Sequence, residues 1–255
     1  MIRGIYTTAT GMMASEQRLD VIANNLANAS TAGFRRDGVN FSEACEREMC
    51  ADGGLGQSLG TLGSGPTATG QYTDFSPGPV TPTGNALDVA IDSPKAAFAV
   101  EVQQPNGTTQ TYYTRDGSFT LNASRQLVDK AGYPVLDDSG RPITLPQGVA
   151  NISADGTVSV DGKSVAKIGV YSGQFVKAAN GLFTPAVGAN GLPVDPQALS
   201  GTTLKTQCVE GSNVDTIKSM IDMITTNRSY ELAQKSIQKQ DDSTQKLIQS
   251  LQTQS

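Results

Sequence analysis

The stretch SNVDTIKSMIDMITTNRSYELAQKSIQKQDDSTQKLIQSL, residues 212–251, predicts one long helix that decides the fold. Ser212 followed by Asp215 is typical of a capping box at a helix start. At about 1.5 Å per residue the helix is roughly 60 Å long, more than the core of one compact domain spans. We therefore expect this helix to need partners.

The apolar residues of this helix form two stripes. Val214, Ile217, Ile221 and Ile224 follow one another at spacings of three and four. The second stripe contains Tyr230, Ala233, Ile237 and Leu247 and ends at Leu251. Nine residues at 100° each separate Ile221 from Tyr230, so the stripes face opposite sides and favour two different partners. The open alternative is a kinked helix that lies across its own domain.

A second helix is predicted at the N-terminal end. Ile5, Met12, Leu19 and Leu26 are each seven apart, with Ile22 in the intervening position, and residues 28–33 end the helix at a glycine. Both helices have narrow apolar seams, which are better buried against a helix than against a sheet, so we expect them to pair as a coiled coil. An intramolecular hairpin that stops there is the alternative to further partners from other copies.

Composition narrows the classes of function. The 255 residues are 37% hydrophobic, carry a net charge of −5 and contain no histidine. An acidic chain without a basic stripe argues against nucleic acid or anionic membrane as a partner. Without histidine the commonest general base and zinc ligand are absent, so we predict no enzyme, no cofactor and no metal site. Cys45, Cys50 and Cys208 cannot all pair, and we assign them no role.

The middle of the chain changes character twice. Residues 35–74 are so rich in glycine that we predict a connector rather than a helix. Residues 75–208 alternate apolar and polar positions between turn dipeptides such as Asp155-Gly156, the pattern of an antiparallel β domain. The predicted class is therefore α+β, divided into an N-terminal helix (1–34), the connector (35–74), the β domain (75–208) and a C-terminal helix (209–255).

Three groups of motifs resemble the bacterial flagellar basal-body rod and hook proteins. They are Ala23-Asn-Asn-Leu-Ala-Asn28 with Thr31-Ala-Gly-Phe-Arg35; Leu87-Asp-Val-Ala-Ile91 with Tyr113-Thr-Arg-Asp-Gly117; and Glu210-Gly-Ser-Asn-Val-Asp215 with Asp222-Met-Ile224 and Tyr230-Glu231. Their order matches that of the family and spans nearly the whole chain. One departure is Ser93-Pro-Lys-Ala-Ala-Phe98, which replaces a glycine-containing segment with two aromatic residues and puts the local turn in doubt.

The resemblance implies a structural axial subunit of the flagellar basal-body rod, with other copies, other rod and hook proteins and the flagellar type III export apparatus as partners. The chain begins without a signal-peptide pattern and contains no apolar run long enough to span a membrane, so we expect export without a cleaved signal peptide and assembly in the periplasm. We expect the terminal segments to stay largely disordered until neighbours cover their apolar stripes.

The predicted assembly interface contains Ile5, Met12, Leu19, Ile22, Asn24, Asn25, Leu26, Val214, Ile217, Ile221, Ile224, Tyr230, Ile237 and Leu247. The short connector favours a proximal-rod protein over a distal-rod protein of the same family. A cell-wall-binding β module on a helical stalk is the alternative from another class.

Overall fold

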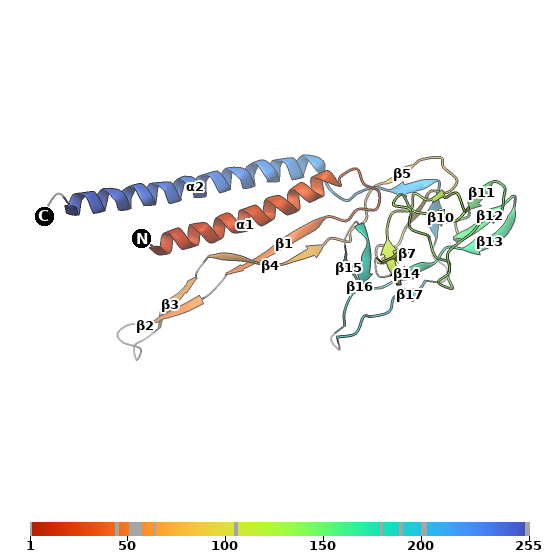
Figure 1. Cartoon of the computed structure of the whole chain (residues 1–255), viewed down its shortest axis with the longest axis horizontal. Helices are drawn as coiled ribbons and strands as arrows, with labels where there is room; N and C mark the ends of the chain where they lie inside the picture. Colours follow the sequence, from red (N-terminus) through yellow and green to blue (C-terminus); the bar gives the residue numbers. More distant parts are fainter. Residues whose placement is uncertain are drawn as a thin grey trace. The chain divides into compact units, whose positions relative to one another are not determined.

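A computed structural model describes residues 2–43, 46–50, 58–63, 65–104, 107–178, 181–188, 191–199 and 203–252. For residues 2–3, 46–50, 58–63, 247 and 250–252 it describes the backbone only. Cys45 and the side chains of Cys50 and Leu247 therefore lie outside the described part. The chain is α+β, with one long helix near each end and mostly antiparallel strands between them (Figure 1).

The chain divides into two compact units. The first, called here the helical unit, contains Met1–Ala27, Asp37–Tyr72 and Asp215–Ser255. The second, the β unit, contains Asn28–Arg36 and Thr73–Val214. Each unit therefore combines segments from both halves of the sequence.

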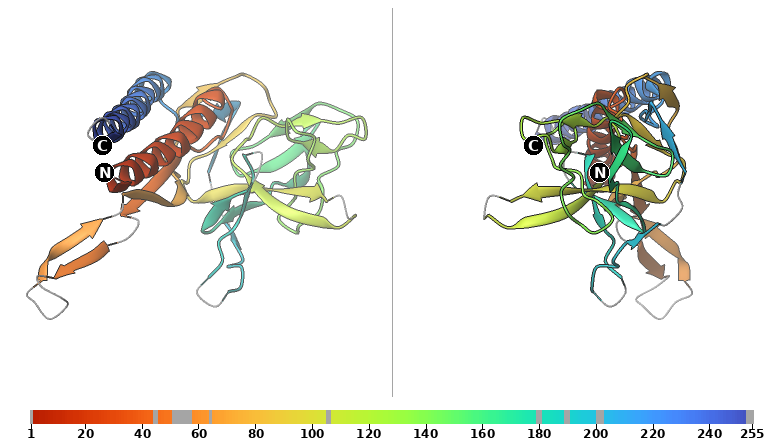
Figure 2. Two further views of the ribbon diagram at one scale, coloured as in Figure 1. Left: turned by 60° about the vertical axis from the view of Figure 1, so that its left-hand side comes forward. Right: turned by 90° about the vertical axis from the view of Figure 1, so that its right-hand side faces the viewer.

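The helical unit is built on α1 (Ile2–Ala27) and α2 (Thr216–Gln252). The helices pack side by side and run in opposite directions (Figures 1 and 2). Gly4 lies opposite Gln240, because a Cβ built on Gly4 would lie 3.0 Å from the Nε2 atom of Gln240. Helix α1 also contacts the first strand of the unit, so it is covered on two sides.

The residues predicted as a connector form paired strands. They are β1 (Asp37–Glu43), β2 (Glu46–Cys50), β3 (Ser58–Gly63) and β4 (Pro66–Thr73). Strand β1 pairs with β4, and β2 pairs antiparallel with β3. The predicted absence of helix is confirmed over these strands, and the extended backbone is held by strand pairing.

The β unit contains short strands in several small sheets. Its strands are β5 (Val80–Pro82), β6 (Val89–Ile91), β7 (Ala96–Gln103), β8 (Thr109–Thr114), β9 (Thr120–Leu121), β10 (Leu127–Val128), β11 (Ala150–Ile152), β12 (Thr157–Val160), β13 (Lys163–Lys167), β14 (Val170–Ser172), β15 (Phe175–Lys177), β16 (Phe183–Pro185), β17 (Gln197–Ala198), β18 (Leu204–Thr206) and β19 (Cys208–Glu210). The largest sheet has the order β15-β16-β8-β7-β14-β17, and β18 and β19 pair with β6 and β5.

The core of the β unit lies on both faces of strand β7. The side chains of this strand alternate between two hydrophobic clusters. Phe98 and Val100 face the larger cluster, in which Phe98 meets Phe119 edge to face at 5.1 Å. Ala97 and Ala99 face a smaller cluster around Tyr113 and Phe183. The period of two predicted for this strand is therefore correct, and both of its faces are buried.

The start of the C-terminal helix differs from the prediction. Helix α2 begins at Thr216, and the Asp215 carboxylate accepts a hydrogen bond from the backbone N–H of Lys218 (3.0 Å), so Asp215 is the N-cap. Ser212 instead accepts from the N–H of Val214 (3.2 Å). The capping-box prediction was wrong because Asn213 donates to the carbonyl oxygen of Asp74 (2.8 Å) and accepts from the N–H of Arg36 (2.7 Å), which holds the preceding residues in the β unit.

Candidate functional site: the helix pair and a buried ionic cluster

The interface between α1 and α2 follows alternating spacings of three and four on both helices. On α1 the predicted residues Ile5, Met12, Leu19 and Leu26 are half-buried, and Ile22 is buried. On α2 this spacing runs through buried or half-buried residues, namely Ser219, Met223, Thr226, Tyr230, Ala233, Ile237, Gln240 and Thr244, while Asp222 is half-buried outside the spacing. We call these positions the inner seam. The second predicted stripe, at Tyr230 and Ile237, therefore faces α1.

The inner seam of α2 is unexpectedly polar in its first half. Ser219 and Thr226 are only 8% and 6% exposed. Their hydroxyls donate to the carbonyl oxygens of Asp215 (2.7 Å) and Asp222 (2.7 Å), one turn earlier in the same helix. Such bonds satisfy the hydroxyls without joining the two helices. In this half of α2 two of the buried side chains are therefore small hydroxyls, beside the half-buried Met223.

The first predicted stripe faces away from α1. Ile217, Met220, Ile221 and Ile224, called here the outer stripe, are 74%, 49%, 55% and 54% exposed. At 100° per residue Ile221 lies about 180° from Tyr230, which points inward. In the first half of α2, Ile217, Met220, Ile221 and Ile224 thus lie outside while Ser219 and Thr226 are buried, whereas a helix that folds against its own chain alone turns its large apolar residues inward.

Three of the predicted interface residues occupy other places. Val214 is buried in the β unit before α2 begins, so it does not continue the outer stripe. Asn25 is buried and holds Asp37 at the start of β1, donating to its carbonyl oxygen (2.8 Å) and accepting from its N–H (2.9 Å). Asn24 is exposed on α1. Sequence reasoning grouped these residues because motif position does not reveal which way a side chain points.

The β unit buries a cluster of three charged side chains. The Arg35 Nη2 atom lies 2.6 Å from Oε1 of Glu210, and the Arg115 Nη2 atom lies 3.0 Å from Oε2 of the same carboxylate. These side chains are 0%, 2% and 2% exposed. Arg115 also donates to the carbonyl oxygens of Ser93 and Ala96. The segment that departs from the family pattern therefore supplies backbone acceptors to this cluster.

The cluster holds one carboxylate between two guanidinium groups. Burial lowers the pKa of Arg115, and the opposing charge of Glu210 acts against that shift. The N–H of Gly78 also donates to Glu210 Oε1 (3.0 Å). Nε and Nη1 of Arg35 are buried and have no hydrogen-bond partner among the described residues. Removing the single carboxylate would leave two buried cations unpaired.

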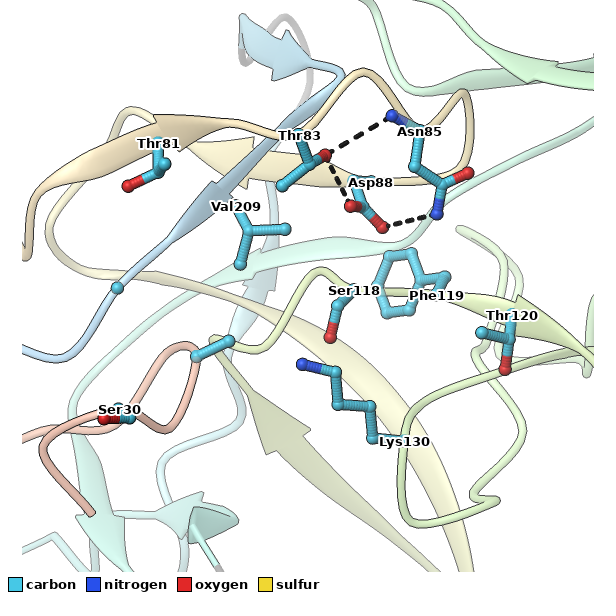
Figure 3. Close-up of a pocket in the computed structure, with 12 residues that line it drawn as sticks. Ser30, Thr81, Thr83, Asn85, Asp88, Ser118, Phe119, Thr120, Lys130 and Val209 are labelled. Atoms are coloured by element: carbon cyan, nitrogen blue, oxygen red, sulfur yellow. Dashed lines mark hydrogen bonds between the residues drawn. The ribbon is translucent and has the colours of Figure 1, made fainter.

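The β unit also contains a pocket of about 390 Å³ (Figure 3). In this pocket the Asp88 carboxylate accepts hydrogen bonds from the Thr83 hydroxyl (2.6 Å) and the Asn85 amide (2.9 Å). Ser118, on the facing wall, donates to Asp116, which also accepts from the backbone N–H of Ser118 (2.9 Å). These bonds close turns, and among the lining side chains they pair no nucleophile with a free base.

Comparison with known proteins matches three parts of the chain to families. Residues 5–35 match the flagella basal body rod protein family, residues 98–160 the flagellar hook protein FlgE/F/G D1 domain, and residues 205–250 the flagellar basal body rod FlgEFG protein C-terminal family. The chain is 34% identical to the flagellar basal-body rod protein FlgG of Buchnera aphidicola subsp. Schizaphis graminum, over 98% of this chain and 100% of that protein. The chain belongs to the flagellar basal-body rod protein family.

Other relatives place this rod protein near two named types. It is 35% identical to the rod protein FlgF of Mesorhizobium japonicum over 89% of this chain and 88% of the relative. It is 30% identical to FlgG of Bacillus subtilis over 97% of this chain and 98% of the relative. The predicted function is confirmed: this rod protein is a structural subunit of the flagellar basal body and assembles with other axial components. Among its described helices, none is long and apolar enough to cross a membrane.

The three matched regions meet in the ionic cluster. Arg35 ends the first region, Arg115 lies in the second and Glu210 lies in the third. The sequence identified all three as motif residues but gave none of them a role. No local sequence pattern pairs them, because Arg35 and Arg115 lie beside other charged residues and Glu210 is 175 positions from Arg35. In this rod protein the cluster joins the segment that follows α1 to the segment that precedes α2 within the β unit.

Proposed function

We propose that the rod protein polymerises through its terminal helices, which pair as a coiled coil within each chain and contact helices of other copies through the outer stripe. The coiled-coil pairing is supported by the alternating spacings of three and four along the α1–α2 interface. Contact with other copies is supported by the exposure of Ile217, Ile221 and Ile224 in the single chain.

The inverted arrangement of α2 is the observation that carries this proposal. A helix that stays in water gains nothing from three exposed isoleucines, whereas burying each one against a neighbour stabilises the contact by about 1.5–3 kcal/mol. Small residues such as Ser219 and Thr226 at the inner seam contribute little to the stability of the free helix pair. The helical unit thus gains most of its stability on assembly.

Export and position in the rod belong to the same proposal. A helix pair that is weakly stable before assembly suits passage through the flagellar type III apparatus as an unfolded chain without a cleaved signal peptide. The predicted division at residues 1–34, 35–74, 75–208 and 209–255 stays a proposal for the rod core, the connector and the β domain; the compact units differ from it, because residues 28–36 and 209–214 belong to the β unit and residues 37–72 to the helical unit. We assign the proximal rod because the glycine-rich segment is short; relatives of both the FlgF and FlgG types support a rod position of either kind.

The test replaces Ile221 with Asp in cells that carry this chain as their only copy. Ile221 is 55% exposed, so the free chain should keep its stability, whereas an assembled contact would bury the new carboxylate at a cost of several kcal/mol. We expect normal protein levels and lost motility. Val149→Asp is the matched control, because Val149 is 76% exposed in the β unit. Normal swimming by the Ile221→Asp variant would refute assembly through the outer stripe.

A further inference from the structure

A groove of about 340 Å³ lies beside the helix pair within the helical unit. Its walls come from both helices and include Gly11, Ala14, Ser15, Thr225, Thr226 and Ser229, all with short side chains or none. Phe41 of β1, Pro66 of β4 and Arg18 of α1 complete its lining. Grooves of about 300–1,000 Å³ accommodate groups as large as a drug molecule, so several aliphatic side chains fit in this one.

The hydroxyls that line the groove are already satisfied. Ser15 donates to the carbonyl oxygen of Gly11 (2.8 Å), and Ser229 donates to that of Thr225 (3.0 Å). Thr225 and Thr226 both donate to the carbonyl oxygen of Asp222, at 3.0 and 2.7 Å. An apolar occupant would therefore bury these hydroxyl groups without leaving their hydrogens unpaired, so it would avoid the usual cost of burying polar groups.

The outer stripe has the complementary chemistry. Ile217, Ile221 and Ile224 are large, β-branched and exposed, and they lie on the side of α2 that faces away from α1. The groove lies between α1 and α2, so a chain cannot place its own stripe in its own groove. The outer stripe of another copy of the same chain can occupy the groove, because axial subunits of this family assemble in many copies.

We propose that the outer stripe of one copy docks into the groove of the next copy, a contact that rests on the proposed self-assembly. A helix inserted between two others packs by ridges into grooves. The two surfaces are different parts of the molecule, so each copy offers one stripe and one groove. We propose that each copy gives its stripe to one neighbour and its groove to another, because such a heterologous contact builds an open helical tube when its rotation does not close, whereas a reciprocal exchange would stop at a dimer.

Disulfide crosslinking in assembled basal bodies tests this contact. Cys45, Cys50 and Cys208 are first replaced by Ser, and then Ile221→Cys and Ser15→Cys are introduced together. Two cysteines form a disulfide only when their Cβ atoms lie about 3.5–4.5 Å apart. After oxidation we expect a ladder of dimers, trimers and longer species, and no crosslinks from the Ser15→Cys chain alone. The matched control pairs Ile221→Cys with Lys235→Cys, which is exposed on α2 outside the groove and should give no ladder.

Two results would overturn the proposal. Dimers from the Ile221→Cys chain alone, without a ladder, would show stripe packed on stripe. Absence of a ladder from the double variant, in basal bodies that contain it, would show that the stripe docks elsewhere. In either case a loss of motility in the Ile221→Asp variant would leave assembly through the outer stripe intact, so the two proposals fail separately.

If the cysteine variants do not assemble, variants that change the size of the side chains in the groove and in the stripe test the docking instead. Gly11 lines the groove and a Cβ built there meets no atom within 4 Å, so we expect the side chain of Gly11→Leu to extend into the groove. We expect a fall of about tenfold in rod incorporation, which corresponds to about 1.4 kcal/mol. Gly11→Ala, which leaves the groove open, should assemble normally. Adding Ile221→Ala to Gly11→Leu should restore part of the loss, and the absence of both loss and rescue would contradict docking in the groove.

Discussion

The two units of this rod protein bury opposite kinds of residue. In the β unit the large apolar side chains lie inside, with Phe98, Phe119 and Leu127 fully buried, and even the charged Arg35–Glu210–Arg115 cluster is paired within the chain. In the helical unit the first half of α2 differs, because Ser219 and Thr226 are buried there while Ile217, Ile221 and Ile224 are exposed. The β unit thus buries its largest aromatic side chains within the single chain, whereas α2 of the helical unit presents a row of exposed isoleucines that the proposed assembly would cover.

The largest expected effect follows from removing the carboxylate of the ionic cluster. Glu210→Gln leaves Arg35 and Arg115 buried without their counter-charge, and losing one partner of a buried ion pair costs about 3–5 kcal/mol. We expect a loss of that size in the free energy of unfolding of the β unit, measured by urea denaturation. Asp92→Asn is the control, because it breaks an exposed pair with Lys205 and should have little measurable effect. Equal effects of the two changes would contradict a structural role for the cluster.

Two isoleucines provide the sharpest comparison between the units. Ile143 is 2% exposed in the β core, so Ile143→Ala should cost about 2–5 kcal/mol of unfolding free energy. Ile221→Ala removes the same atoms from an exposed site, so the free chain should change by less than about 0.5 kcal/mol. Assembly should show the reverse order, with Ile221→Ala impairing rod incorporation. If Ile221→Ala destabilised the free chain as much as Ile143→Ala, the outer stripe would be buried within one molecule.

A smaller effect is expected where the first matched region meets the second. Gly33 has φ of +67°, and a Cβ there would lie 2.4 Å from the carbonyl carbon of Arg115. Gly33→Ala should therefore destabilise the β unit by more than the about 1–2 kcal/mol that a left-handed conformation alone costs. Gly132→Ala is the matched control, since Gly132 has φ of +89° and open space around it. Thermal unfolding of the two variants measures the difference, and equal shifts would show that the contact with Arg115 is loose.

The smallest effect concerns pH in the β unit. Burial raises the pKa of the Asp129 carboxyl, although backbone hydrogen bonds from Tyr133 and Ala131 act against it. A raised pKa means that the stabilisation from this group is fully present below the ordinary aspartate pKa and is lost as pH rises through the raised value. The Asp129→Asn variant cannot ionise at this position. Its stability relative to the natural chain should therefore increase as pH rises, and this difference should vanish at low pH.

Asp74 is the control of opposite sign. A backbone hydrogen bond from Ser76 lowers the pKa of its carboxyl, with Arg36 adding to the shift. Its stabilisation is present above the ordinary aspartate pKa and is lost as pH falls. Asp74→Asn should therefore lose stability relative to the natural chain at neutral pH. Unfolding curves at several pH values measure both, and parallel curves for the two variants would contradict these assignments.

Periodicity predicted the regular elements well. The seven-residue repeat of Ile5, Met12 and Leu19 predicted a helix, and the structure has α1 over these residues with all three side chains half-buried. The half-turn between Ile221 and Tyr230 likewise gave the two faces of α2, one exposed and one against α1. The strands of the β unit followed from alternation and turn dipeptides.

Other features depend on contacts between distant residues, which periodicity does not report. The N-cap moved from Ser212 to Asp215 because Asn213 is bound to Asp74 and Arg36, far away in sequence. The sequence did not predict that Ser219 and Thr226 are buried in the inner seam, because serine and threonine are typical of a helix surface. The ionic cluster joins Arg35 to Glu210 across 175 positions, and no local pattern pairs them.

Amide hydrogen exchange of the dilute chain and of assembled rods tests the central claim most directly. In the dilute chain we expect amides of residues 217–230 to exchange rapidly and those of residues 96–102 in the β core to be protected, because only the β unit is complete by itself. In assembled rods both segments should be protected. Equal and strong protection of both segments in the dilute chain would contradict the claim that the helical unit depends on its neighbours.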